Sequence, residues 1–435
     1  MKKFIFLTLL FLQNFIFAGE NDTLTTGNVI FIHPDGTGLT NWYAMRTLYY
    51  GPDSCSNWDK LPQMAIYSTH TKNTLTTSSN AGATMHSYGK KVVYDSYGMN
   101  GTDTLTALSG KKLSIMQEAK SKGILTGIVN SGHIIEPGTG VFAASSKSRK
   151  NTEEIAKKIA QSGLDLIFSG GEDFLLPKGV KGKFCTGKRE DGLNLIEWLK
   201  ENGYEVIYTK EELLNLTGNE KKVFGVFAEG HTFNDESEEK LKELGLQNFN
   251  PEAPTIAEMT EAAIKFFDKK NKQFFLVAEE EATDNFGNYN NANGMLQALK
   301  RADDAIGIAS KFVDKNKKTM LITASDSEAG GMEILNHKKL EKDKPTPAND
   351  KTGSQYDGQF GTGTIPFVAK PDKFGNAMPF IIGWTTASDL PGCVVARAKG
   401  LNENLMRGSI QNTDIYRFMY ATLFGKLLEK EKGKK

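Results

Sequence analysis

The sequence predicts an α/β fold in which a mostly parallel central sheet has helices on both faces. Apolar runs of strand length alternate along the chain with segments whose apolar residues recur at helical spacing. The run 274–277 (Phe-Phe-Leu-Val) is apolar at every position, as in strands that are buried on both faces. Strands that alternate with helices in this way typically build a parallel sheet.

The predicted elements follow one another in a regular order. The chain is expected to form strands over 29–32, 124–129, 166–168, 205–208, 223–227, 274–277 and 320–323, and helices over 153–160, 193–201, 255–267 and 296–312. Pro254 stands directly before the helix 255–267, where its fixed backbone angle suits a helix start. A stretch rich in Pro, Gly and Asn, 337–363, predicts a loop excursion that forms a crown or lid. We therefore expect one large domain, 19–435, with an insertion near 337–380.

The first eighteen residues have the pattern of a secretory signal. Lys2 and Lys3 precede an apolar run, 4–12, and a second apolar stretch ends at Ala18, a small residue suited to cleavage. Ile16 is not ideal for cleavage after Ala18, so an uncleaved anchor is the alternative, although the apolar run is short for a membrane span. We expect 1–18 to be a signal peptide and the mature protein to be periplasmic or secreted.

Composition is that of an ordinary globular protein. The 435 residues are 24% charged and carry a formal net charge of +1; removal of Lys2 and Lys3 lowers this by two, to −1. Such a balance gives no support for nucleic-acid binding. No later stretch is long and apolar enough to cross a bilayer. The three cysteines are too widely spaced for a zinc-binding cluster; one pair could form a disulfide, or all three could be incidental.

Acidic residues follow three of the predicted strands. Asp35 follows 29–32, Asp326 follows 320–323, and Glu279, Glu280, Glu281 and Asp284 follow 274–277. In open α/β sheets, ligands bind beyond the carboxyl ends of strands. Clustered carboxylates near a buried strand are costly unless something positive binds them. The pattern therefore predicts a site for several metal ions with hard oxygen ligands.

A hydroxyl-rich segment, 76–79, supplies a candidate nucleophile. Ser79 precedes a run of small residues, and taken alone it would simply cap a helix. The same position lies in a field that favours anions, and beside metal ions the hydroxyl could ionise and attack phosphorus. His86 lies about 10 Å further along a helix and is badly placed as its base. For His33, next to Asp35, packing is the favoured role and support of that carboxylate the alternative.

In their order and spacing, these segments resemble the alkaline phosphatase family of metal-dependent phosphomonoesterases. The likeness spans most of the chain, through 28–38, 79–91, 136–149, 169–172, 254–260, 279–284 and 323–332. The resemblance implies an alkaline-phosphatase-like α/β fold with crown insertions. It also implies that Ser79 is the nucleophile and that Arg149, thirteen residues after Glu136, holds the phosphate. Asn80 would bind the phosphate as well, or only cap the helix.

The resemblance also implies a set of metal ligands: Asp35, Ser79, Glu136, Glu279, Asp284, Asn288 and Asp326. Asp35 would bridge two ions, and Glu136 and Glu279 would complete one of these two sites. Asp326 would join Asp35 and Ser79 at the second. A third site would contain Asp284 and Asn288, with Thr385 as a further candidate. In this scheme Glu280 and Glu281 are outer-shell or solvated.

Several positions depart from the family pattern. Three histidines that the family uses for zinc are replaced by Asn288, Ser327 and Thr385, and Ser78 stands in place of an acid before the nucleophile. The hydroxyl expected two residues after Glu136 is Gly138, with Thr139 adjacent. Because oxygen ligands suit hard cations, we expect two or three divalent cations, with Mg2+ and/or Ca2+ favoured and Zn2+ or Mn2+ as the alternative.

The predicted function is hydrolysis of small-molecule phosphate monoesters through a phosphoserine intermediate. A phosphodiesterase of the same superfamily is one alternative, and a non-catalytic phosphate- or metal-binding relative is another. The presence of both Ser79 and Arg149 counts against the last of these. We expect no nucleic-acid partner and no stable membrane span after signal cleavage, and a homodimer is left open.

Overall fold

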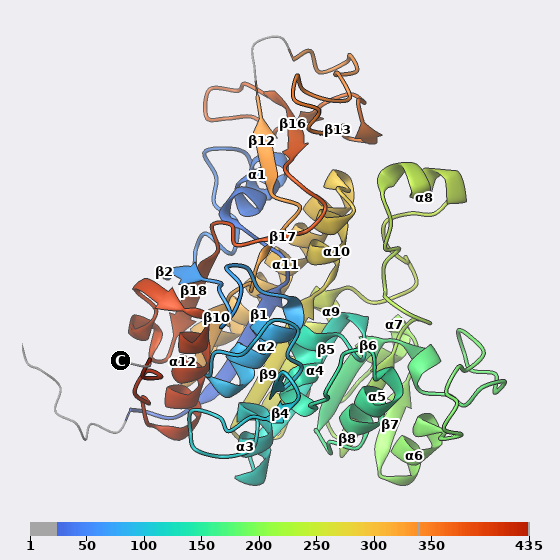
Figure 1. The fold of residues 1–435 in the computed structure, drawn as a ribbon, viewed down its shortest axis with the longest axis vertical. Coiled ribbons are helices and arrows are strands. Elements are labelled where there is room, and N and C mark those ends of the chain that lie inside the picture. The colour runs from blue at the N-terminus through green and yellow to red at the C-terminus, as the bar shows by residue number, and fades with distance from the viewer. Residues whose placement is uncertain (1–23, 337–339, 434–435) are drawn as a thin grey trace, which may run out of the picture.

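The central sheet is built from ten strands, β1 (Asn28–Pro34), β2 (Gln63–Ser68), β5 (Leu125–His133), β6 (Leu166–Gly170), β7 (Tyr204–Ile207), β8 (Lys222–Val226), β9 (Phe274–Glu280), β10 (Thr319–Thr323), β18 (Val395–Gly400) and β19 (Gly408–Gln411). Their spatial order is β19-β2-β18-β10-β1-β9-β5-β6-β8-β7 (Figure 1). The structure, a computed structural model, describes residues 24–336 and 340–433. The expected signal peptide, 1–18, therefore lies outside the described residues.

Seven neighbouring strands, from β10 to β7, run parallel. β18 is antiparallel to both β10 and β2, while β19 is parallel to β2. The prediction of a mostly parallel α/β sheet is confirmed. The three strands of the mixed edge, β18, β2 and β19, were not among the predicted strands.

Helices cover both faces of the sheet, and each face has its own hydrophobic core. Side chains along β1 point alternately into one core and the other. Val29 and Phe31 belong to one core and Ile30 and Ile32 to the other. The first core contains residues of α2 (Ser79–Tyr88), α3 (Ile115–Ser121), α4 (Pro137–Ala143), α5 (Thr152–Ala160), α6 (Leu195–Glu201) and α12 (Asn412–Phe424). The second contains residues of α1 (Leu39–Tyr49), α7 (Lys210–Leu214), α8 (Glu238–Leu244), α9 (Ile256–Lys269), α10 (Ala282–Asn288) and α11 (Ala292–Lys315).

The predicted helix 255–267 shows how closely local signals set an element. Thr255 caps α9, and its side chain accepts a hydrogen bond from the backbone N–H of Glu258. The carboxylate of Glu258 in turn accepts from the backbone N–H of Thr255, at 2.9 Å. The helix starts where this reciprocal pair satisfies backbone groups that would otherwise lack partners.

The register of the central strands brings their carboxyl ends level with one another. On β9, Glu279 lies opposite His33 of β1 on one side and Asn130 of β5 on the other. On the far side of β1, Ile32 lies opposite Thr323 of β10. The polar residues that follow these strands consequently emerge at a single edge of the sheet.

A second, antiparallel sheet forms the narrow lobe at the top of Figure 1. It contains β12 (Met332–Leu335), β13 (Tyr356–Gly358), β14 (Gly361–Thr362), β15 (Phe367–Val368) and β16 (Pro379–Trp384). Inside it, the indole Nε1 of Trp384 donates to Asp357 at 2.6 Å. The described part of the expected insertion, residues 340–380, includes β13, β14 and β15 of this lobe. Below the lobe, β11 (Glu328–Ala329) pairs with β17 (Asp389–Leu390) and connects it to the main sheet.

Two further predictions concern membrane-spanning segments and the cysteines. Within the described residues, none of the helices is at once long and apolar enough to pass through a bilayer. Cys55, Cys185 and Cys393 are all unbonded. The disulfide that one pair could have formed is therefore not formed in the structure.

Candidate metal centre and active site

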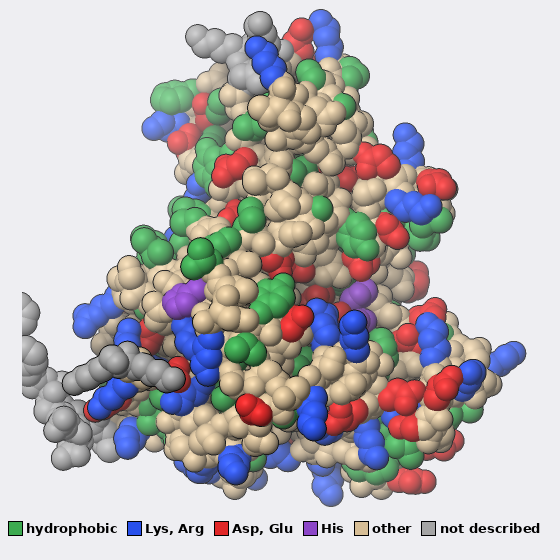
Figure 2. Space-filling model, in the orientation of Figure 1, with side chains coloured by type: hydrophobic (Ala, Val, Ile, Leu, Met, Phe, Trp, Pro, Cys, Tyr) green, Lys and Arg blue, Asp and Glu red, His purple; other side chains and the backbone are tan. Residues whose placement is uncertain are grey.

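Polar side chains gather at the carboxyl edge of the sheet, where the upper lobe joins the wide lower part. Figure 2 shows acidic and histidine side chains at the surface in this region. Among the residues at or after the carboxyl ends of the strands, those at least 93% buried include Asp35, Glu136, Glu279, Glu281, Asp284 and Asp326. Since ionised groups avoid burial unless they are paired, such a concentration of carboxylates indicates a site that binds cations.

His33, Asp35 and Glu279 form the first group. The Nε2 atom of His33 lies 3.3 Å from Asp35 Oδ1 and 3.9 Å from Glu279 Oε1. The Nδ1 atom of the same ring lies 2.7 Å from the carbonyl of Ala324. Because a carbonyl oxygen only accepts, Nδ1 carries a proton and donates a hydrogen bond to Ala324, so that Nε2 can face the two carboxylates as a donor to them or as a metal ligand. A packing role, which the sequence favoured for His33, does not account for this orientation.

Asp35, Glu281 and Asp284 form a second group whose oxygens are close enough to hold one ion. The loop after β1 and the helix α10 approach each other closely there. A Cβ on Gly36 would lie 2.5 Å from Asp284 Oδ1, and Gly36 has a φ of +61°, so the position requires glycine. The expectation of solvated side chains at Glu280 and Glu281 is wrong, because both side chains are buried, while an outer-shell role stays a prediction.

Asn288 and Asp389 extend the second group. The side-chain N–H of Asn288 donates to Asp284 Oδ2 at 3.0 Å and to Asp389 Oδ1 at 3.2 Å. Asp389 is a further acid that the sequence comparison did not single out. Thr385, by contrast, is exposed and donates its hydroxyl to the carbonyl of Gly331 at 3.0 Å.

Asp326 lies against the start of α2, the helix that begins at Ser79. Ser78 caps this helix and accepts from the backbone N–H of Ala81. A Cβ on Gly82, in the first turn, would lie 2.4 Å from the Asp326 side chain. The glycine thus lets the helix N-terminus approach the carboxylate. Ser79 itself is 8% exposed.

Asn80 and Arg149 differ in their surroundings. Asn80 is fully buried, and both polar atoms of its side chain are without hydrogen-bond partners among the described residues. The Arg149 side chain is 49% exposed, and its Nη2 lies 3.7 Å from Glu136 Oε2. Although burial lowers the pKa of Arg149, the nearby carboxylates of Glu136 and Glu281 raise it above its usual value. Arg149 therefore remains charged and free to turn toward an anion.

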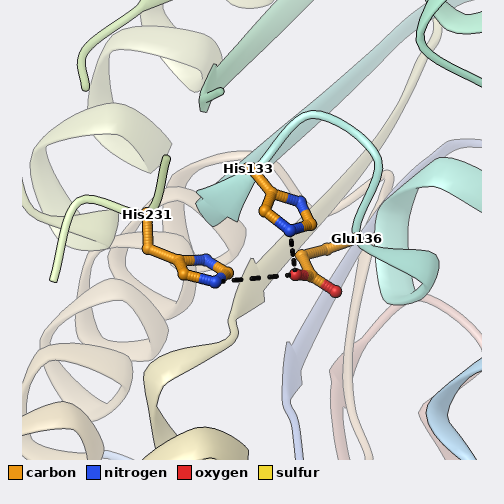
Figure 3. Close-up of side chains that lie close together, drawn as sticks. All are labelled: His133, Glu136 and His231. Carbon is orange, nitrogen blue, oxygen red and sulfur yellow. Dashed lines mark ion pairs between the residues drawn. The ribbon is translucent and has the colours of Figure 1, made fainter. Parts of the chain in front are cut away.

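Glu136 belongs to a third group, with His133 and His231 (Figure 3). Its Oε1 lies 2.9 Å from His133 Nε2 and 3.9 Å from His231 Nε2. Burial raises the pKa of Glu136, but the charge and hydrogen bond of His133 outweigh it and bring the pKa to about 2. The structure thus groups Glu136 with two histidines, rather than with Glu279 as the family pattern implied.

Glycine at position 138 has a steric reason. A Cβ there would lie 1.6 Å from Glu279 Oε1. The family's hydroxyl residue would collide with this carboxylate in the present arrangement. The neighbouring Thr139 instead accepts from Asn130 Nδ2 at 2.8 Å, and Asn130 also donates to Glu279. The hydroxyl of Thr139 is therefore linked to the Glu279 carboxylate only through the side chain of Asn130.

We expect Gly138→Ala to displace the Glu279 carboxylate, with a loss of stability of about 1–3 kcal/mol from overpacking. Activity should fall along with the thermal midpoint, because Glu279 lies in the first carboxylate group. Gly230→Ala is the matched control, since a Cβ at Gly230 meets nothing within 4 Å. Calorimetry and steady-state kinetics of the two variants would test this; equal behaviour would contradict the steric argument.

The donor set fits divalent cations, because it contains buried atoms that other protein groups do not satisfy. Among the described residues, hydrogen-bond partners are lacking for His33 Nε2, Asp35 Oδ2, Glu136 Oε2, Glu279 Oε1, Glu281 Oε2, Asp284 Oδ1, Asn288 Oδ1 and Asp326 Oδ2. Burial raises the pKa of Glu279 to about 8, with added repulsion from Asp35 and Glu136. Burial and neighbouring carboxylates raise the pKa values of Asp284 and Asp326 well above the usual range. Bound cations would relieve this repulsion and fill the unused coordination positions.

The predicted acidic ligands thus lie together at the carboxyl edge of the sheet, although not in the groups that the sequence suggested. Asp35 and Glu279 come together, as do Asp35 and Asp284, and Asn288 lies beside Asp284. Sequence reasoning missed His133, His231 and Asp389, and it gave the role of His33 beside Asp35 only as an alternative. For His133, the three-residue interval to Glu136 was an available signal. His231 lacked any signal of this kind, because it meets the others only through the fold.

The fold is that of a large α/β enzyme whose polar pocket lies at the carboxyl edge of the sheet. Residues 26–424 match the profile of a protein family described as alkaline phosphatase. The chain belongs to the alkaline phosphatase family, and it is accordingly an enzyme of the phosphatase class.

Individual relatives agree with this assignment. The chain is 25% identical to alkaline phosphatase 4 of Bacillus subtilis, in an alignment that covers 93% of this chain and 90% of the relative. Among solved structures, the fold matches the alkaline phosphatase of the Antarctic bacterium TAB5 with a TM-score of 0.68, at 22% identity over 92% of this chain and 99% of the other. It matches that of Thermus thermophilus with a TM-score of 0.71, at 19% identity over 96% of each chain.

Proposed function

We propose that this phosphatase is an exported, metal-dependent phosphomonoesterase that works through a phosphoserine on Ser79. The observation that carries the proposal is the convergence of one buried, acid-rich pocket with the N-terminus of the helix that begins at Ser79. Ser79 would attack phosphorus with its Oγ, the leaving alcohol would depart from the opposite side, and water would then hydrolyse the phosphoserine. Divalent cations would lower the pKa of the serine hydroxyl and neutralise charge on the reacting oxygens.

The residues of the pocket take distinct roles in this proposal. Arg149 would bind two phosphate oxygens through its planar guanidinium, after it turns away from Glu136. Asn80 would donate to a third oxygen with a side chain that has no other hydrogen-bond partner in the described ranges, 24–336 and 340–433. Each role is consistent with the burial and charge of its residue, because the phosphate supplies the anion that Arg149 and the helix N-terminus attract.

The cations would be held by two acidic groups and by Asp326. His33, Asp35 and Glu279 would hold one, and Asp35, Glu281 and Asp284, with Asn288 and Asp389 beside them, would hold another. Asp326 would complete the set next to α2. This donor set is dominated by oxygen and therefore suits Mg2+ or Ca2+, while the imidazole of His33 adds a position that Zn2+ or Mn2+ also accepts.

Export and substrate class belong to the same proposal. The segment 1–18 has the pattern of a secretory signal, so the enzyme would act on small phosphate esters in a periplasmic or extracellular space. The substrate would be a monoester because Arg149 and Asn80 together recognise several unsubstituted phosphate oxygens. A diester lacks one of these ionised oxygens.

The test compares p-nitrophenyl phosphate with bis-p-nitrophenyl phosphate under a screen of divalent cations. Loss of one charged hydrogen bond costs about 1.5–3 kcal/mol, so we expect kcat/KM for the monoester to exceed that for the diester by about 10- to 100-fold. A preference for the diester would reassign the enzyme to the phosphodiesterases of its superfamily. Phosphate binding without turnover under every metal would indicate a binding protein instead.

A further inference from the structure

We propose that His133, His231 and Glu136 form a separate nitrogen-rich metal site, which takes Zn2+ or a similar late first-row cation. The three side chains come from different parts of the chain. His133 ends β5, Glu136 precedes α4, and His231 lies in the loop after β8. Figure 3 shows both rings with a nitrogen turned toward the same carboxylate oxygen.

The spacing of the donor atoms suits a tetrahedral ion. With bonds of about 2.0–2.1 Å, neighbouring ligands of a tetrahedral zinc lie about 3.3 Å apart. The two nitrogen–oxygen separations, 2.9 and 3.9 Å, lie on either side of that value. Asp235 Oδ2 lies 4.0 Å from His231 Nε2, and a water molecule would supply the fourth coordination position.

Packing holds the two imidazoles in place without using their metal-facing nitrogens. The rings of His133 and His231 stack with centroids 4.5 Å apart and an interplanar angle of 20°. Phe174 contacts the outer side of His133, and Phe233 stacks on His231. Both imidazoles face the same carboxylate. They cannot both form ion pairs with it favourably, because two protonated rings at this distance would repel each other.

Glu136 contributes a buried carboxylate to this group. It is only 3% exposed, and its Oε1 is the oxygen that faces both histidines. Two neutral imidazoles and one carboxylate suit zinc, whereas Mg2+ and Ca2+ prefer oxygen ligands alone. This site should therefore discriminate against the cations that suit the acidic groups around Asp35.

The position of the site connects it to the phosphate-binding residue, and this connection rests on the proposed function. Glu136 Oε1 faces the histidines, while Oε2 lies 3.7 Å from Arg149 Nη2. A cation on Oε1 would weaken the hold of Glu136 on Arg149. We therefore expect zinc at this site to release Arg149 and so to strengthen the binding of inorganic phosphate.

The experiment is a Zn2+ titration of the full-length, metal-stripped protein in excess Mg2+, followed by gel filtration and metal analysis. We expect His231→Ala and His133→Ala each to retain one equivalent of zinc fewer than the wild type. His70→Ala is the matched control, because His70 contacts Lys91 rather than a carboxylate and should bind zinc as the wild type does. Equal zinc retention in the wild type and His231→Ala would overturn the proposal.

Further measurements separate this proposal from failure to fold and from the proposed function. Circular dichroism of each zinc-free variant checks the fold, and Glu136→Gln, which keeps the side-chain shape, should also lose the zinc. Ser79→Ala should keep the zinc equivalent even when turnover is lost. The two proposals can fail separately. If the wild type shows no turnover but His231→Ala still binds one zinc fewer than the wild type, the proposed reaction is refuted and the metal site is supported. If zinc leaves phosphate affinity unchanged, the connection to Arg149 is wrong.

Discussion

Replacement of Ser79 by alanine is expected to lower the turnover of p-nitrophenyl phosphate by at least about 10³-fold, because the variant cannot form a covalent intermediate. Ser79 begins α2, and Ser78, not Ser79, provides the cap of this helix. The substitution should therefore leave the circular dichroism spectrum and the thermal midpoint close to those of the wild type. Mass spectrometry of acid-quenched reactions should detect a phosphorylated serine in the wild type and none in the variant.

Ser78→Ala is the matched control for this experiment. Its hydroxyl accepts hydrogen bonds from the backbone N–H groups of Ala81 and Asp95. Loss of such a cap costs about 1 kcal/mol of stability, but turnover should stay within about tenfold of the wild type. The opposite pattern, an active Ser79→Ala variant and an inactive Ser78→Ala variant, would transfer the nucleophile to Ser78.

The central sheet was predictable because strong local signals agree with the tertiary structure. The apolar run 274–277 lies within β9, where every residue is buried, and the helix predicted over 255–267 is α9 with its reciprocal cap at Thr255. The mixed edge was harder to predict. On β2, Met64 and Ile66 remain largely exposed while Ala65 and Tyr67 are buried, so this short strand lacks the continuous apolar run that marked the others.

The position of the candidate site in the fold was predictable, but the grouping of its ligands was not. Carboxylates after parallel strands had to converge, because parallel strands end at the same edge of a sheet. Which atoms meet depends on register and on loops that a linear pattern does not determine. His33 lies opposite Glu279 only through the β1–β9 register, and His231 reaches Glu136 only through the loop after β8. Three histidines are thus present in the pocket region, although not at the positions that the family pattern led us to expect.

Removal of metal is expected to abolish turnover and to make stability strongly dependent on pH. The carboxyls that crowd the pocket have raised pKa values in the folded protein, about 8 for Glu279 and about 7 for Glu280, with burial as the main cause. In the unfolded chain the same groups titrate at about 4.3. A raised folded-state pKa stabilises the fold at low pH, and this contribution is lost as pH rises through the folded-state value.

These pKa shifts set the direction in which pH changes the stability of the metal-free enzyme. His33, whose pKa is raised to about 9 by Asp35 and Glu279 against the effect of burial, acts in the same direction as the two glutamates. Asp35 and Glu136 have lowered pKa values and would change stability only in strongly acidic solution. After dialysis against EDTA, the thermal midpoint should therefore fall steadily between about pH 6 and about pH 9.

Divalent cations should reverse this dependence. A bound cation replaces the protons on the carboxyls, so its apparent affinity rises with pH, and it stabilises the folded state by binding only there. The metal-loaded enzyme should keep a nearly constant thermal midpoint over the same pH range and regain turnover. Differential scanning calorimetry at matched pH values, with EDTA or with added Mg2+, Ca2+, Mn2+ or Zn2+, measures both effects. An EDTA-treated enzyme whose midpoint rises with pH would show that the buried acids are stabilised as carboxylates by the protein alone, and the acidic groups around Asp35 would then not be a metal centre.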